Sequence, residues 1–503
     1  MSVRVVVSAA ALSVLASSAH ADVIVSTDPT QNMTCSGGVC SPTQANAVLN
    51  VNDLANMLAT ADTKVTTGSG AVNIDVVAAL SWSSASRLTL DANTGLNVQA
   101  AVTVAGSGAL TLTYNDGGKN GDLIFSNGGN ATFANLGSSL IINGNRYKLA
   151  ADLRALARQI KKNLSGFYAL ANSYDASVDG TYAASPIRGQ FQGAFEGLGN
   201  AIINLKINAD PKKKYVGLFE QVPYTNIGVL RDIQLVNANV AGSSIVGILA
   251  GENAGTIANA SATGVVVSAG HGGGLVGSHD TGLIRNCHTN VTVNATGSAG
   301  GLAGFELGGG SPAIFQSSAS GAVSGGLWAG GLAGINYGSV ERSYATGNVT
   351  GAEQSYTAGL VGADGLGSAI ADSYATGNVK AGQSALVGGL VGFSYKWKGH
   401  QNASSVSTSY SLGPISSGRK SKIGGFAGNV DGVQSNYWDL TTSKNEHGVG
   451  KGCRSGGSCS RNVTGLSDDQ LKAGLPTGFD PKIWGQSPNI NNGYPYLLAN
   501  PPQ

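Results

Sequence analysis

A short glycine- and leucine-containing motif, Gly-Leu-(Val/Ala)-Gly, recurs in the second half of this 503-residue chain and restricts what it can fold into. A longer motif, Ser-Tyr-Ala-Thr-Gly-Asn-Val, also occurs twice, at 343–349 and 373–379. Internal repeats of about 20–50 residues are typical of solenoids, propellers and arrays. The central residues of the first motif and of its two looser copies stand at positions 249, 275, 302, 332, 360, 390 and 426, so that one repeat is 26–36 residues long.

The repeat favours a β-solenoid over the other repeat architectures. Helical solenoids are disfavoured because glycine is a poor helix former and Val, Thr, Ser and Tyr predominate between the glycines. A propeller blade needs four strands and about 40 or more residues. The observed length fits one coil of three short strands with turns. We therefore predict an all-β fold, a parallel β-helix in which successive coils stack.

Each residue of the motif has an expected place in such a coil. The leucines are expected to point inward and to stack on one another. The glycines are expected to form tight corners, because glycine adopts positive φ without penalty, and to allow close approach between coils about 4.8 Å apart. The predicted structural residues are the leucines Leu275, Leu302, Leu332, Leu360 and Leu390 and the glycines Gly274, Gly277, Gly304, Gly334, Gly362 and Gly392.

The composition agrees with a folded rather than a disordered chain. Glycine contributes 75 of the 503 residues, but 42% of the residues are hydrophobic and the net charge is only +2. Disordered chains combine low hydrophobicity with high net charge. A net charge close to zero also gives no support for nucleic acid or an anionic membrane as a partner.

The two motifs together resemble the GLUG motif, a repeat of large secreted bacterial proteins. Gly-Gly-Leu-Val-Gly followed by Ser-Tyr-Ala-Thr-Gly-Asn-Val carries the resemblance, most clearly over residues 245–436. The resemblance implies a right-handed β-helix and a protein of the filamentous-haemagglutinin type, many of which are adhesins. The Asn-Pro-Asn-Gly motif used by many such proteins for secretion through an outer-membrane partner does not occur. An outer-membrane secretion partner is therefore only one possible route.

The first residues have the pattern of an export signal. Arg4 precedes a small apolar run at 5–15, and Ala19-His20-Ala21 offers a cleavage site, so Asp22 is the expected mature N-terminus. A buried strand or a membrane anchor is the alternative, but the apolar run is too short to span a bilayer comfortably. No later segment has the length and hydrophobicity of a transmembrane helix. We expect a protein that is secreted or exposed on the outer cell surface.

Four of the five cysteines form two closely spaced pairs, Cys35 with Cys40 and Cys453 with Cys459, each enclosing a Gly-Gly. In an exported chain such pairs favour small disulfide loops. A four-thiolate metal site is the alternative, although neither pair has the Cys-x-x-Cys spacing common in zinc sites. The fifth cysteine, Cys287, is expected to be a buried apolar side chain.

Together with the repeat, the remaining parts of the chain divide it into five expected segments. Alternating runs at 87–91 and 109–114 predict strands in an N-terminal β-rich region, which we expect to form further β-helix coils. Leucine and isoleucine at positions 149, 153, 156, 160 and 164 form the apolar stripe of one helix, expected to pack on the solenoid rather than to bind a membrane or a partner. The segments are 1–21 (signal), 22–148 (β-rich), 149–185 (helical connector), 186–436 (repeat β-helix) and 437–503 (disulfide-containing cap).

The C-terminal segment has the features of a cap. Ser467 to Gln470 forms a capping box that predicts a short helix. Trp484, Tyr494 and Tyr496 are expected to form the core of a cap over the open end of the solenoid, with a sugar-binding platform as the alternative.

Catalytic constellations are not apparent in the sequence. The few acidic residues of 245–436 do not recur at one phase of the coil, and the histidines show no metal-binding spacing. We therefore predict no catalytic residues, no metal and no cofactor. The leading hypothesis is an adhesin-like protein that binds a host or matrix glycan or protein. The alternatives are a carbohydrate-active β-helical enzyme, either a polysaccharide lyase or a glycosidase, and a purely structural stalk.

Overall fold

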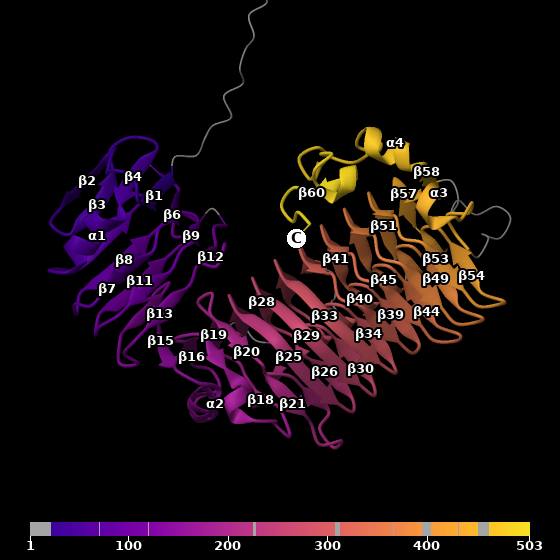
Figure 1. The fold of residues 1–503 in the computed structure, drawn as a ribbon, viewed down its shortest axis with the longest axis horizontal. Coiled ribbons are helices and arrows are strands. Elements are labelled where there is room, and N and C mark those ends of the chain that lie inside the picture. Colours follow the sequence, from indigo (N-terminus) through magenta and orange to yellow (C-terminus); the bar gives the residue numbers. More distant parts are fainter. Residues whose placement is uncertain are drawn as a thin grey trace, which may run out of the picture. The chain divides into compact units, whose positions relative to one another are not determined.

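The computed structural model describes residues 22–502, except for 70, 119, 225–227, 307–311, 366, 395–403, 431 and 451–461. These residues form a mostly β, parallel solenoid of about 15 turns with a few short helices (Figure 1). The predicted all-β solenoid is therefore confirmed. The chain divides into two compact units, residues 1–127 with 141–144 and residues 128–140 with 145–503.

Parallel strands stacked coil on coil form the first unit. Three stacks run through it, β1–β6–β9–β12, β3–β5–β8–β11 and β7–β10. The predicted strand at 87–91 is β8, in which Leu88 and Leu90 are buried. The strands of the first unit are β1 (Asp22–Ser26), β2 (Met33–Ser36), β3 (Val39–Pro42), β4 (Ala47–Asn50), β5 (Thr63–Thr66), β6 (Asn73–Val76), β7 (Leu80–Trp82), β8 (Arg87–Asp91), β9 (Leu96–Val98), β10 (Val102–Val104), β11 (Ala109–Thr113) and β12 (Leu123–Phe125).

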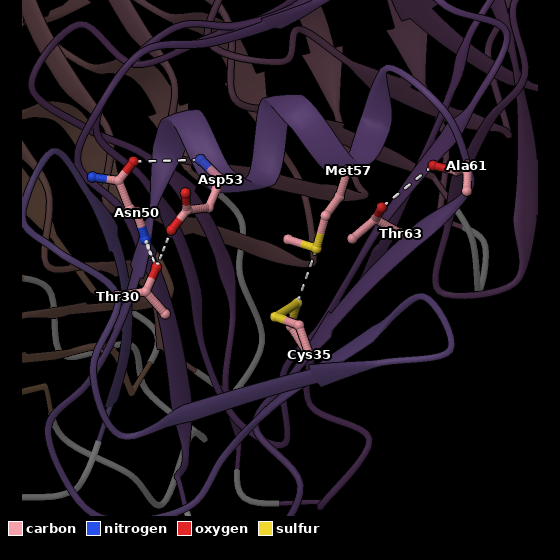
Figure 2. The surroundings of a disulfide bond; sticks show 8 residues. Thr30, Cys35, Asn50, Asp53, Met57, Ala61 and Thr63 are labelled. Atoms are coloured by element: carbon pink, nitrogen blue, oxygen red, sulfur yellow. Dashed lines mark hydrogen bonds between the residues drawn. A yellow bond between two sulfur atoms is a disulfide. The ribbon is translucent and has the colours of Figure 1, made fainter.

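A disulfide joins Cys35 and Cys40 across the antiparallel hairpin of β2 and β3, where the two residues face each other with their Cα atoms 4.0 Å apart. Figure 2 shows Met57 pointing toward this disulfide, and its Sδ lies 3.8 Å from Sγ of Cys40. The first predicted pair is thus present. The second pair, Cys453 and Cys459, lies outside the described residues.

The helix that carries Met57, α1 (Val51–Leu58), has no counterpart in the sequence-based expectations. The side chain of Asn50 caps it by accepting hydrogen bonds from the backbone N–H groups of Asn52 and Asp53. Figure 2 shows the second of these bonds. Val51, Leu54 and Leu58 are buried and hold the helix on the strands. The pattern was available in the sequence as a cap followed by an apolar 3–4 spacing.

The predicted connector helix is present but shorter than expected. α2 (Leu153–Lys162) begins after Asp152, whose side chain accepts from the N–H of Ala155. Leu153, Leu156 and Ile160 form its buried stripe against the solenoid core, as predicted. Leu149 instead lies in the strand before the helix, and Leu164 follows its end with 36% of its surface exposed.

The repeats of the second unit form four parallel sheets, which we number I to IV in the order in which each coil visits them. The coil from Ser339 to Asp364 contains five short strands, β41–β45, instead of the three predicted, because sheet II takes two strands from it. Sheet I contains β15 (Asn145–Ala150), β16 (Phe167–Leu170), β19 (Ala194–Glu196), β24 (Val229–Arg231), β28 (Thr256–Ala258), β32 (Leu283–Arg285), β36 (Pro312–Phe315), β41 (Ser339–Glu341), β46 (Ala369–Ala371), β51 (Ser405–Ser407) and β56 (Val433–Gln434).

Sheet II is the longest of the four, because its strands extend into the C-terminal segment. It contains β17 (Tyr174–Asp175), β20 (Ala201–Ile203), β21 (Lys206–Asn208), β25 (Gln234–Gly242), β29 (Ser261–Ser268), β33 (His288–Ala295), β37 (Ser318–Ala319), β38 (Val323–Gly325), β42 (Tyr344–Ala345), β43 (Val349–Gly351), β47 (Tyr374–Ala375), β48 (Val379–Ala381), β52 (Tyr410–Ser411), β53 (Ile415–Ser417), β57 (Asn436–Asp439) and β58 (Val463–Leu466).

Sheets III and IV flank the Gly-Leu-(Val/Ala)-Gly motif, which links a strand of sheet III to the next strand of sheet IV. Sheet III contains β22 (Tyr215–Val216), β26 (Ile245–Gly247), β30 (His271–Gly273), β34 (Ser298–Gly300), β39 (Trp328–Gly330), β44 (Tyr356–Ala358), β49 (Leu386–Gly388) and β54 (Lys422–Gly424). Sheet IV contains β18 (Ile187–Gln190), β23 (Phe219–Val222), β27 (Ala250–Asn253), β31 (Val276–His279), β35 (Ala303–Glu306), β40 (Ala333–Asn336), β45 (Val361–Asp364), β50 (Val391–Ser394) and β55 (Ala427–Asn429).

The motif leucines form the predicted inward stack. All five have no exposed surface. The backbone N–H of each donates to the carbonyl oxygen of its counterpart in the next coil, for example from Leu275 to Leu302 over 2.9 Å. Cys287 is also fully buried, as predicted, and burial raises the pKa of its thiol to about 12.

The motif glycines act through their lack of a side chain and not through positive φ, so that part of the prediction is wrong. None of the six has a positive φ. A Cβ on Gly274 would lie 2.0 Å from the carbonyl oxygen of Gly301 in the next coil, and one on Gly334 would lie 2.5 Å from that of Gly304. The left-handed corner falls after sheet I and is occupied by Asp232, Asn259, Asn286, Gln316, Arg342, Asp372, Thr408 and Ser435.

The serine and tyrosine of the longer motif each form a ladder along sheet II. The N–H of Ser343 donates to Oγ of Ser373, which occupies the same place one coil further on, over 3.2 Å. The rings of Tyr344 and Tyr374 stack with centroids 4.8 Å apart, and those of Tyr374 and Tyr410 with centroids 5.1 Å apart. This explains why the motif repeats these two residues.

The C-terminal segment covers that tyrosine stack as well as the last coil. The ring of Trp484 lies 5.8 Å from that of Tyr410, and the hydroxyl of Tyr344 donates to the carbonyl oxygen of Pro501 over 3.1 Å. Trp484 and Tyr494 are buried as predicted, while Tyr496 is half-buried. The segment contains α3 (Leu440–Ser443), α4 (Asp468–Ala473) with the predicted capping box, the 3₁₀ turn η3 (Asn491–Gly493), β59 (Trp484–Gly485) and β60 (Tyr496–Leu497).

Three further short elements precede the repeat. They are β13 (Ala131–Phe133), β14 (Leu140–Ile142) and the 3₁₀ turn η1 (Ala176–Asp179).

Candidate functional site

A few charged side chains of the described repeat are buried inside the solenoid, among them Glu306 and Asp364. Within the described residues, no group of three or more His, Cys, Asp and Glu side chains is placed to hold a metal ion. In the same part of the chain, no helix has the length and hydrophobicity to cross a membrane. Of the histidines, His271 and His288 are half-buried on sheets III and II, and His279 is fully buried in sheet IV.

A polar ladder runs through the interior at the last position of the sheet IV strands. Within it, Nδ2 of Asn253 lies 3.0 Å from Nδ1 of His279, and Nδ2 of Asn336 donates to Oδ1 of Asp364 over 2.8 Å. Every member is buried, and Glu306 and Asp364 have no exposed surface. The members are Asn253, His279, Glu306, Asn336, Asp364 and Ser394.

The two carboxyl groups of this ladder both have raised pKa values. Burial raises the pKa of Asp364 to about 7, against the smaller opposing effects of Ser368 and Asn336. Burial and the nearby Asp364 raise the pKa of Glu306 well above its usual value. Because both groups face the interior, a ligand in solvent does not reach them. Their role is in the pH dependence of the fold.

A second buried cluster stands at the corner after sheet I. Nε of Arg231 lies 2.6 Å from Asp232 and 3.4 Å from Glu196. Burial, followed by the charge of Asp232, raises the pKa of Glu196. The side chain of Asn259 in the next coil donates to Asp232 over 3.0 Å. These contacts fix the corner between sheets I and II and leave no open carboxylate pair.

The outer faces of sheets III and IV carry the most distinctive surface of the repeat, which we call the aromatic line. All of its side chains are half-exposed. They come from two positions of the repeat, four residues before the motif leucine and three residues after it, and from the residue that follows β40. The aromatic line consists of His271, Phe305, Trp328, Tyr337, Tyr356 and Phe393.

Members of the aromatic line touch across coils. The rings of His271 and Phe305 have centroids 5.6 Å apart, and Phe305 meets Tyr337 edge-on at 5.8 Å. Tyr356 stacks on Phe393 with centroids 5.0 Å apart. In each of the pairs between sheets, the sheet III residue belongs to one coil and the sheet IV residue to the next. The line therefore extends along the solenoid axis.

Trp328 enlarges the apolar part of this surface. It pairs in register with Tyr356 of the next coil. Its indole Nε1 is buried and has no hydrogen-bond partner among the described residues, so the half-exposed part of the side chain is apolar ring surface. The aromatic line was not among the features predicted from the sequence. The signal was the variation at the fourth position before each motif leucine, where Ile245, His271, Ser298, Trp328, Tyr356, Leu386 and Lys422 stand.

Comparison with known proteins finds one family match within the repeat and two further similarities. Residues 325–350 match the model of the GLUG motif family. A stretch of 132 residues, 26% of this chain, is 34% identical to halomucin of Haloquadratum walsbyi, of which it spans only 1%. A crystal structure described as a "putative immunoglobulin A1 protease" from Bacteroides ovatus aligns with a TM-score of 0.34 and 17% identity, over 71% of this chain and 92% of that one.

Proposed function

We propose that this β-helical GLUG-motif protein is an adhesin-like binding protein, secreted or exposed on the outer cell surface, whose ligand is a glycan chain of a host or matrix. The aromatic line is the observation that carries the proposal. Half-exposed aromatic rings in a row are uncommon on a surface that meets only water, and they mark interaction sites. The stacked aromatic rings give each coil an apolar surface. A sugar ring of an extended glycan chain can lie on this surface.

The repeated geometry suits an elongated ligand. Each coil adds one short element of surface, so several weak contacts along the axis combine into avidity without a deep pocket. The acids with raised pKa values in this region, Glu306 and Asp364, are inside the coil and away from the line. The Cys35–Cys40 disulfide is consistent with an oxidising compartment, and the N-terminal pattern with export.

Truncation of the line is the direct test. We expect the double substitution Trp328→Ala and Tyr356→Ala to weaken binding to the glycans selected by the intact protein at least tenfold, because two stacking surfaces are lost. The measurement is a screen of residues 22–503 on arrays of glycans and matrix proteins, followed by titration with the selected glycans.

Tyr224→Ala serves as the matched control, because this aromatic side chain is 74% exposed and lies outside the aromatic line. It should bind as the unsubstituted chain does. If the screen selected only matrix proteins, the ligand would be a protein and the glycan part of the proposal would be wrong. Equal affinity of the double variant and the control would remove the aromatic line as the site.

A further inference from the structure

A pocket of about 360 Å³ lies between α2 and β15, before the repeat begins. It is open to solvent and belongs to the second unit. Its walls come from the loop at 136–138, from the strand and from the end of the helix. The lining residues are Leu136, Gly137, Ser138, Arg146, Tyr147, Lys148, Leu149, Gln159 and Lys162.

The charged residues of the pocket are all cationic. Arg146 and Lys148 stand two residues apart on β15, and Lys162 is the last residue of α2. All three are exposed, and none forms an ion pair with the described residues. No acidic residue lines the pocket. In a chain with a net charge of +2, three cations around one cavity select an anionic ligand.

Two polar atoms in the wall are buried and lack partners, which is independent of the charges. Ser138 has only 8% of its surface exposed, and its Oγ has no hydrogen-bond partner in the described structure. Nε2 of Gln159 donates to the carbonyl oxygen of Leu149 over 3.0 Å, but its Oε1 is buried and unpartnered there. A buried polar atom without a partner costs free energy, so a ligand that pairs with it gains affinity.

The two atoms, Oγ of Ser138 and Oε1 of Gln159, need different hydrogen-bond partners. The amide oxygen of Gln159 accepts only, so it needs a ligand hydroxyl or amide N–H, whereas the Ser138 hydroxyl can donate to an anionic oxygen. The ring of Tyr147, held edge-on against Phe167 with centroids 5.4 Å apart, and the 48% exposed Leu136 add apolar surface. A ligand that satisfies all of these carries a carboxylate, several hydroxyls and an apolar ring face.

We propose that this pocket is a binding site for an acidic sugar residue of the uronic acid type. The carboxylate lies among Arg146, Lys148 and Lys162, and the ring hydroxyls meet Gln159. The site goes beyond the proposed function, because it is a pocket with its own residues and binds independently of the aromatic line.

Titration with a tetragalacturonate and with its carboxyl-reduced, neutral counterpart tests the proposal, measured by calorimetry on residues 22–503. Lys162→Glu is expected to weaken binding of the tetragalacturonate at least tenfold, and Ser138→Ala about fivefold, through loss of one hydrogen bond. Lys161→Glu is the matched control. It makes the same charge change on the adjacent exposed residue of α2, which does not line the pocket.

Binding of the acidic chain that falls with Lys162→Glu and stays within twofold with Lys161→Glu supports the site. Equal binding of the acidic and neutral chains, equal loss in the two lysine variants, or no binding would overturn it. The Trp328→Ala and Tyr356→Ala variant should still bind the tetragalacturonate in the pocket with a stoichiometry of about one. The failure of this proposal and that of the aromatic line are thus separate results.

Discussion

Gly274→Ala is expected to lower the free energy of unfolding by about 3 kcal/mol or more. This is the upper end of the range of costs for overpacking a rigid protein interior. The added Cβ would lie 2.0 Å from the carbonyl oxygen of Gly301, a backbone atom that cannot turn away as a side chain could. That carbonyl accepts a hydrogen bond from Oγ1 of Thr289 in its own coil over 2.8 Å, and the N–H of Gly301 donates to the carbonyl oxygen of Gly331 in the coil beyond. The strain therefore spreads through the stack or breaks it locally.

The control is the same substitution at Gly474, which follows α4 with an extended φ of 172° and has nothing within 4 Å of an added Cβ. We expect its stability to be unchanged or raised by up to about 1 kcal/mol, because alanine restricts the unfolded chain. Urea unfolding followed by circular dichroism compares the midpoints. If both variants unfolded at the same urea concentration, the coils would have to separate freely, and the close-approach account of the motif would be wrong.

The inward leucines and the glycines differ in how much of their role is visible in a sequence. Burial of Leu275 and its counterparts follows from an apolar residue recurring at one phase of a repeat, so the stack could be predicted. For the glycines, both positive φ and close approach between coils were expected, because both select glycine. Only the position of the neighbouring coil shows that close approach is the reason. The left-handed corner was hidden because eight different residues occupy it, Asp232 and Arg342 among them.

Candidate binding residues were harder to predict than the core for a related reason. Side chains such as Trp328 and Tyr356 stand at equivalent places in different coils but differ from coil to coil, so they do not form a motif. Their neighbourhood depends on which sheet III strand meets which sheet IV strand of the next coil. The pocket at Ser138 and Lys162 brings together a loop, a strand and a helix end, and no spacing in the sequence signals that meeting.

The buried carboxyl groups of the polar ladder are expected to make stability fall as the pH rises. Asp364 has an ordinary pKa of 3.8 in the unfolded chain and about 7 in the folded one. Below pH 3.8 the carboxyl is protonated in both states and its contribution is fully present. Between the two values the unfolded chain ionises while the folded chain keeps its proton, so stability is lost until about pH 7. The difference between these two pKa values corresponds to about 4 kcal/mol of unfolding free energy.

Asp364→Asn removes the ionisable group and keeps its shape and the hydrogen bond from Asn336. The variant should therefore lose stability less steeply than the unsubstituted chain between pH 5 and pH 8, and should be the more stable of the two at pH 8. Glu306, whose pKa is also raised, leaves a residual slope of the same sign. Urea unfolding at pH 5, 6, 7 and 8 measures the slopes.

Glu353→Gln provides the comparison, because it removes one carboxylate from an exposed turn of the same coil. Its stability should follow the pH as that of the unsubstituted chain does, since an exposed carboxylate keeps its hydration in both states. If the stability of Asp364→Asn and that of the unsubstituted chain changed in parallel with pH, water or a neighbouring charge would have to stabilise the ionised carboxylate of Asp364. The interior of these coils would then tolerate an ionised carboxylate, and the burial of Glu306 and Asp364 would carry no pH dependence.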